Sequence, residues 1–240
     1  TWDPDHTYDY PEGYLQVDFF GASLKINNLG GYCANAEATN GCTAIVDGHD
    51  TSQPILLYEN IGKLRKVGDA KAAGLTTVHL KVEVAPGSQY VANNGERVNG
   101  FGRNNAFGEI NLGGRPEDMT NANDETNEAT FIFTLLDGGV DGVGATMAPV
   151  EGLNFFAFSY FDFDATEEMN GQECLTLLEP SPDEDKYGLA FVGDTISQST
   201  ASNNAPKFCA TRYGNRFDNP AVPGDVGEVE SVDENGVMSF

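Results

Sequence analysis

The stretch TVHLKVEV, residues 77–84, alternates apolar and polar side chains without a break. Every second residue is Val or Leu, which gives one face four apolar side chains: Val78, Leu80, Val82 and Val84. Side chains alternate between the two faces of a β-strand, so this pattern is typical of a strand that is half buried. We expect the opposite face, including His79, to point toward solvent.

Similar stretches lie on both sides of this strand. Those with strand-like composition span residues 14–26, 53–61, 129–137, 153–164, 173–179, 187–196 and 206–214. Gly, Asn, Asp and Pro lie between them, as tight turns require, and no stretch has a convincing helical period. About eight to twelve strands without helices predict an all-β fold. We expect an antiparallel β-sandwich or jelly roll with long loops and extended terminal arms.

The stretch YLQVDFFGASLKI, residues 14–26, changes phase along its length. Its apolar residues are first odd-numbered, as in Leu15 and Val17, and then even-numbered, as in Leu24 and Ile26. A one-residue insertion into one strand of a pair has this effect. We therefore predict a β-bulge at Phe20–Gly21.

The two ends differ in composition from the rest of the chain. We predict an N-terminal arm over residues 1–14, a single β-sandwich domain over residues 15–217, and an acidic C-terminal tail over residues 218–240. The tail packs either onto its own domain or onto a neighbouring copy, as an arm or an added strand.

The charge of the chain excludes several partners. The formal net charge is −24, which excludes nucleic acid because phosphate binding needs a basic surface, and it argues against anionic membranes. No apolar run is long enough for membrane insertion. Residues 117–240 hold 24 acidic residues against 4 Lys and Arg. Because like charges destabilise a compact state, we expect cations or other copies of the chain to neutralise this half.

The four cysteines suit disulfide bonds better than a metal or redox site. None belongs to a CxxC pair and their number is even. Three pairings are open, and we favour Cys33–Cys42 with Cys174–Cys209. Disulfides indicate an oxidising compartment. The chain begins at Thr1 without a signal peptide, as a processed chain would, so we expect it to be secreted or at the cell surface.

An acidic loop follows the strand predicted over residues 153–164. Asp162 and Asp164 share one face of the strand end, about 6.5–7 Å apart from the strand rise. Hard cations such as Ca²⁺ bind six to eight oxygens, and we predict a structural Ca²⁺ site with the following ligands: Asp162, Asp164, Glu168, Asn170 and Glu173. The alternatives are a solvated loop and a carboxylate pair of a glycosidase. We assign no catalytic residue.

A glycine-rich stretch, residues 99–114, is expected to form a long surface loop or hairpin. Its amides and aromatic ring could contact a glycan through Asn104, Asn105 and Phe107, although turn formation alone also explains these residues.

Two segments resemble a known group of proteins. FFAFSYFDFD with GQEC, and later FCATRYGNRFDNPAVP, are similar to segments of secreted or cell-surface β-rich proteins of marine algae and other protists. The resemblance covers roughly residues 100–225 and implies an extracellular β domain.

These observations predict a non-enzymatic extracellular protein, a disulfide-bonded and Ca²⁺-supported subunit of a filament, sheet or surface coat. Its partners are expected to be copies of itself. The residues that we expect at such contacts are aromatic or basic: Trp2, Tyr8, Tyr10, Lys63, Arg65 and Lys66. The first alternative is a carbohydrate-binding module or lectin, and the second is a glycan hydrolase or lyase.

Overall fold

The structure is a computed structural model of residues 1–240. It describes residues 12–17, 19, 21–31, 45–46, 49–50, 53–68, 74–88, 90, 99–101, 108–110, 112, 128–140, 142–157, 159–160, 173–178, 190–191, 196–202, 205–211 and 238–239. The chain divides into two compact units, Thr1–Phe156 and Ala157–Phe240. The predicted ranges 1–14, 15–217 and 218–240 remain predictions.

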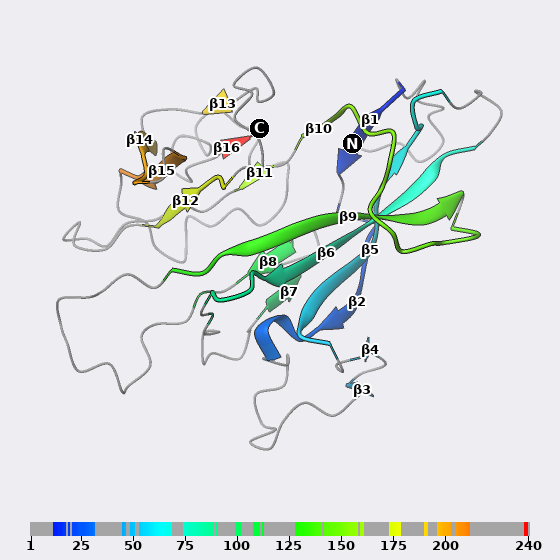
Figure 1. Ribbon diagram of the computed structural model, residues 1–240. Helices are drawn as coiled ribbons and strands as arrows, with labels where there is room; N and C mark the ends of the chain where they lie inside the picture. Colours follow the sequence, from blue (N-terminus) through cyan, green and yellow to red (C-terminus); the bar gives the residue numbers. More distant parts are fainter. Residues whose placement is uncertain are drawn as a thin grey trace. The chain divides into compact units, whose positions relative to one another are not determined.

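The main element of the first unit is a six-stranded sheet with the order β10-β1-β5-β6-β9, in which β2 also pairs with β5. Its strands are β1 (Tyr14–Val17), β2 (Ser23–Asn27), β5 (Ile55–Leu64), β6 (Thr76–Val84), β9 (Phe131–Val140) and β10 (Phe155–Ala157). The pairs β1–β5, β2–β5, β5–β6 and β6–β9 are antiparallel. The long strands β5, β6 and β9 lie side by side and the sheet is curled like half of a barrel (Figure 1).

The apolar face of β6 lies in the core, as its alternation predicts. Val78, Leu80 and Val82 are almost completely buried. In the register of the sheet Leu80 is opposite Tyr58 of β5 and Leu135 of β9, so neighbouring strands supply apolar partners on this face. Burying one such side chain stabilises the fold by about 1.5–3 kcal/mol. The hydrophobic effect on this face therefore holds the three long strands together.

The opposite face of β6 is not solvated throughout. His79 is 8% exposed, so the prediction that it points toward solvent is wrong. His79 is opposite Leu136 of β9, and Leu136 forms a second apolar cluster with Ile26, Ile55 and Leu57. Both faces of the sheet bury side chains here, and a two-residue period alone does not reveal burial of the polar face.

The phase change between Tyr14 and Ile26 interrupts the strand more than a single bulge does. Val17 of β1 is opposite Gly62 of β5, and Ser23 of β2 is opposite Glu59. Five residues therefore separate Val17 from Ser23 along the chain, whereas only Asn60 and Ile61 separate their partners in β5. The register changes in the interval that contains the predicted bulge, although Phe20 lies outside the described residues, and the extra length is three residues instead of one. We call this interval between β1 and β2 the excursion.

The remaining described strands form small antiparallel sheets. In the first unit these are β3 (Ile45–Val46) with β4 (His49–Asp50), and β7 (Asn99–Phe101) with β8 (Gly108–Ile110). The second pair agrees with the hairpin expected over residues 99–114. A 3₁₀ turn, η1, spans Leu29–Gly31.

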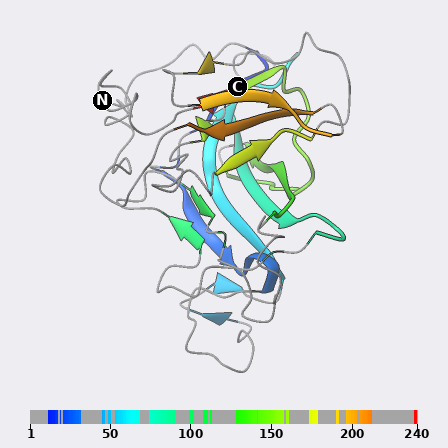
Figure 2. The same ribbon diagram turned by 90° about the vertical axis from the view of Figure 1, so that its left-hand side faces the viewer.

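The second unit contains two three-stranded sheets, β12-β15-β14 and β11-β16-β13. Their strands are β11 (Ser159–Tyr160), β12 (Cys174–Thr176), β13 (Ala190–Phe191), β14 (Ile196–Thr200), β15 (Pro206–Ala210) and β16 (Met238–Ser239). Strands β14 and β15 run side by side in Figure 2. Strand β16 pairs with β11 and β13, so Met238–Ser239 of the acidic tail lies in a sheet of its own chain.

These sheets confirm the predicted all-β antiparallel class. The described residues contain no α-helix, and none of their helical segments could span a membrane.

Candidate functional site

A hydrogen-bonded group of polar residues in the first unit surrounds His79. The backbone N–H of Asn60 donates a hydrogen bond of 2.8 Å to Nδ1 of His79. Asn60 has a left-handed backbone, with φ of 59°, and its side-chain amide donates to the carbonyl oxygen of Gly21 at 2.9 Å. An imidazole nitrogen can accept a hydrogen bond only when it carries no proton. The geometry therefore corresponds to neutral His79 with its proton on Nε2.

Gly138 of β9 lies against the other side of the imidazole. A Cβ atom built on Gly138 would be 2.4 Å from Nε2 of His79 and 3.0 Å from the carbonyl oxygen of Thr77. Only glycine leaves space for the ring at this position. The ring is therefore held between β5, through Asn60, and the end of β9.

Two lysines are bound at the edge of this group. Nζ of Lys66 is 2.7 Å from Oδ2 of Asp137, and the N–H of Gly139 donates to Oδ1 of Asp137 at 2.7 Å. Nζ of Lys63 donates to Oγ1 of Thr77 at 2.7 Å. We call His79, Asn60, Lys63, Lys66, Thr77, Asp137 and Gly138 the His79 cluster.

The electrostatics of the cluster favour an uncharged ring. Burial lowers the pKa of His79, and this effect exceeds the opposite influence of the carboxylates of Glu59 and Asp137. Lys63 lowers it further. The pKa of Asp137 is lowered, chiefly by its hydrogen bond from Lys66. The arrangement holds a neutral imidazole beside the ionised carboxylate of Asp137, so the ring can respond to a change in pH.

A second polar layer connects β7 to the main sheet. The hydroxyl of Tyr58 donates to the carbonyl oxygen of Gly100, Nδ2 of Asn27 donates to the carbonyl oxygen of Asn99 at 3.0 Å, and the hydroxyl of Tyr90 donates to Oδ1 of Asn99 at 2.9 Å. Burial raises the pKa of Tyr58 far above its usual range. Its hydroxyl therefore stays protonated as a structural donor.

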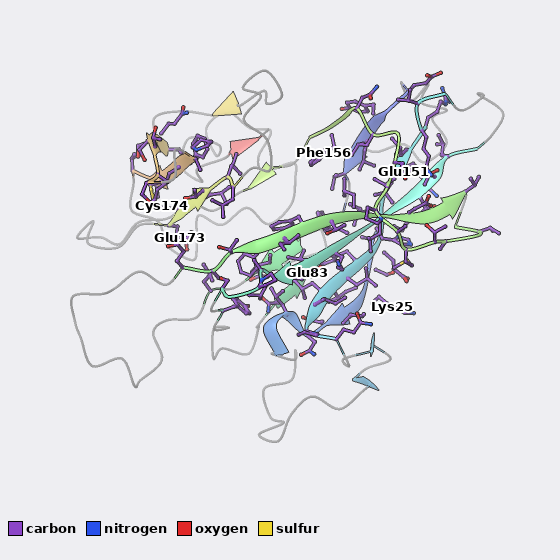
Figure 3. All side chains as sticks on the ribbon, viewed as in Figure 1. Lys25, Glu83, Glu151, Phe156, Glu173 and Cys174 are labelled. Atoms are coloured by element: carbon purple, nitrogen blue, oxygen red, sulfur yellow. A yellow bond between two sulfur atoms is a disulfide. The ribbon has the colours of Figure 1, made fainter. Side chains whose placement is uncertain are left out.

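An open depression of about 720 Å³ lies at the end of β6. It is lined by Gly30, Gln53, Pro54, Ile55, Glu83, Val84, Ala85, Ser88 and Tyr90. Glu83, which Figure 3 labels, is ion-paired with Lys81. The hydroxyl oxygen of Ser88 accepts a hydrogen bond of 2.7 Å from the N–H of Thr130.

Two outer strands of the described sheets lack charge over most of their length. Strand β9, last in its sheet, begins with Phe-Ile-Phe-Thr at residues 131–134, where Ile132 is 41% and Phe133 is 37% exposed. The later part of β9 is covered, because Leu135 and Asp137 exchange backbone hydrogen bonds with residues 147–150. Strand β14, an outer strand of the second unit, reads Ile-Ser-Gln-Ser-Thr, and its last four residues are exposed. These uncharged stretches contrast with the net charge of −24 of the whole chain.

Few of the predicted site residues lie within the described ranges. Lys63 and Lys66 bind Thr77 and Asp137 of their own unit, and the carbonyl oxygen of Arg65 accepts a hydrogen bond of 2.7 Å from Gly13. Outside these ranges lie Trp2, Tyr8, Tyr10, Cys33, Cys42, Asn104, Asn105, Phe107, Asp162, Asp164, Glu168 and Asn170. Within the described part of the chain, no group of three or more His, Cys, Asp or Glu could hold a metal ion.

The disulfide favoured for the later cysteines is present. Cys174 and Cys209 are bonded and lie directly opposite each other in β12 and β15. Glu173, a predicted Ca²⁺ ligand, precedes this disulfide, as Figure 3 shows. Glu173 is exposed, and its carbonyl oxygen accepts a hydrogen bond of 3.0 Å from the backbone N–H of Ala210.

Comparisons with known proteins identify no family for this chain. No family model, no curated protein and no solved structure matches it. These comparisons therefore suggest no function for the chain.

Sequence reasoning missed Asn60 and Gly138 as parts of the His79 cluster. Two signals pointed to them. The strand stretch ending in Leu-Leu-Asp at residues 135–137 is followed by Gly138–Gly139, which leaves space for a neighbouring side chain. Asn60 interrupts the apolar stretch of β5, and asparagine is a residue type that tolerates the left-handed conformation.

Proposed function

We propose that the chain is a non-enzymatic structural subunit of an extracellular assembly in which copies join through the edges of their sheets. The observation that carries this proposal is the absence of charged residues from β14 and from residues 131–134 of β9, at the edges of the described sheets. Natural proteins commonly protect outer strands with charges, prolines or bulges, because such strands can pair with another chain.

The side chains of these strands suit pairing. Residues 131–134 of β9 are aromatic or β-branched, which are the types that strands favour. The exposed residues of β14 are polar and uncharged, so a strand that approaches them meets no like charge. Acidic residues elsewhere would repel other copies, and cations bound between copies would reduce this repulsion.

The Cys174–Cys209 disulfide supports an oxidising compartment. Secretion or display at the cell surface is the corresponding part of the proposal. Ca²⁺ is the cation proposed, with Asp162, Asp164, Glu168, Asn170 and Glu173 as its ligands, because carboxylate and amide oxygens suit a hard ion.

The test is self-association of the Ile132→Lys variant, measured by sedimentation velocity over a range of protein concentrations in calcium. A lysine on an edge strand opposes pairing, so we expect the dissociation constant to rise at least about tenfold. Val67→Lys is the matched control, since Val67 is an aliphatic residue of similar exposure, 48%, outside the strands. The proposal is wrong if the unchanged chain is monomeric at all concentrations, or if both variants behave alike.

A second candidate function is glycan binding, favoured by the depression at the end of β6. Gln53 and Glu83 line it and carry groups that can hydrogen-bond sugar hydroxyls. A glycan array decides this candidate. Selective binding that is lost in Gln53→Ala and Glu83→Gln would support a lectin, and absence of binding by the unchanged chain would exclude it for the glycans on the array.

A further inference from the structure

We infer that His79 is a proton-operated latch that holds the irregular part of β5 closed at neutral pH and releases it in mild acid. The latch consists of one hydrogen bond, from the N–H of Asn60 to Nδ1 of His79, at 2.8 Å. This regulatory device is independent of the proposed assembly.

The latch works because Nδ1 has only one role available in this geometry. When Nδ1 gains a proton it becomes a donor, and the N–H of Asn60 is also a donor. Two donors that face each other cannot form a hydrogen bond, so the contact of 2.8 Å must break. The left-handed backbone of Asn60 then loses a bond that holds it in a sparsely populated conformation.

Burial is the largest influence on the pKa of the ring, and a smaller, opposite influence comes from a hydrogen bond with the backbone of Val78. Gly138 closes one side of the ring. Asp137 of β9 already accepts hydrogen bonds from Lys66 and Gly139. From β5, Glu59 favours the charged ring and Lys63 opposes it. Burial outweighs both carboxylates, which agrees with the lowered pKa of His79.

The sign of the pH dependence follows from this lowered pKa. The unfolded chain binds the proton at about pH 6.5, the ordinary value for histidine, and the folded chain binds it only at lower pH. Stability from His79 is therefore complete above the unfolded pKa and is lost as pH falls through it toward the folded pKa.

Opening of the latch affects more than one strand. Asn60 also donates its side-chain amide to Gly21, in the excursion between β1 and β2. Release of Asn60 therefore loosens the place where both strands meet β5, while the paired ends of β5 and β6 remain.

The test follows amide hydrogen exchange of Asn60 in the full chain between pH 7.5 and pH 5, with each rate divided by the intrinsic rate at that pH. We expect protection of this amide to fall at least about tenfold in acid, since local opening governs exchange. In His79→Asn the side-chain oxygen takes the place of Nδ1 as an acceptor and cannot titrate, so protection is expected to stay constant.

His49→Asn is the matched control and should retain the fall in protection. A titration of the His79 ring by NMR in the unchanged chain needs no variant and should give a pKa below about 6.5. The inference is overturned if the ring titrates at or above this value, or if protection of Asn60 falls equally in His79→Asn and the unchanged chain.

Discussion

Asn60 and Gly138 have opposite roles at the scale of single residues. Asn60 provides a backbone donor from a left-handed conformation, which asparagine adopts more readily than most residues. Gly138 provides empty space, since a side chain there would overlap the imidazole of His79. His79 is buried on the polar face of β6 because these two neighbours admit the ring between them.

The space at Gly138 leads to a prediction for Gly138→Ala. The new methyl group would be 2.4 Å from Nε2 of His79, so the ring or the strand must move. Overpacking of this kind costs about 1–3 kcal/mol of unfolding free energy. Urea denaturation of the full chain measures this loss.

Gly21→Ala is the control for this substitution. Its added Cβ would meet only the amide nitrogen of Asn60, at an ordinary 3.7 Å, and we expect a change within about 0.5 kcal/mol. If the overlap is responsible, Gly138→Ala costs less when His79 is also replaced by alanine. An equal cost in both backgrounds would contradict the role assigned to the ring.

At the scale of elements, the Cys174–Cys209 disulfide joins β12 to β15 across 35 residues of sequence. Closing a loop of this length removes about 3–4 kcal/mol of conformational freedom from the unfolded chain. We therefore predict that Cys174→Ser with Cys209→Ser destabilises the second unit by about this amount. Amide exchange in β12, β14 and β15 measures the loss locally.

The control is the double substitution Cys33→Ser with Cys42→Ser, in the first unit. It should leave amide protection in β15 unchanged. Unchanged protection in the Cys174 and Cys209 variant would instead show that strand pairing alone holds this sheet.

Individual elements show how far the sequence predicts this fold. Strand β6 was predictable because its apolar face alternates without a break, and the bonded cysteines lie in two stretches with strand composition. Burial of His79 was not predictable, because it depends on Gly138 and Asn60, which are distant in sequence. The excursion between β1 and β2 left a phase change that locates it but does not give its length.

At the scale of the whole molecule, repulsion between acidic residues opposes the folded state. The range from Pro116 to Asp185 contains 17 acidic residues and no Lys or Arg. Salt at physiological ionic strength screens exposed charges that lie more than about 8–10 Å apart, whereas a bound divalent ion neutralises two charges at a fixed place. These two mechanisms differ in their dependence on the identity of the cation.

The distinction predicts a selective effect of calcium on thermal unfolding. At constant ionic strength, Ca²⁺ that binds the native chain at about 100 times its dissociation constant adds about 2.7 kcal/mol of stability. For a chain of this size the midpoint should rise by about 5 °C or more, measured by calorimetry in calcium and in chelator. Asp162→Ala with Asp164→Ala should remove this rise.

Glu228→Ala with Glu230→Ala is the matched control, because it removes two carboxylates at the same spacing from the acidic tail. The calcium-dependent rise should persist in this control, since the tail contributes no proposed ligand. Equal losses in both double variants would mean that Ca²⁺ only screens a diffuse charge. A midpoint that is the same in calcium and chelator for the unchanged chain would exclude a stabilising site, and the acidic half would then have to be neutralised by other copies or by salt alone.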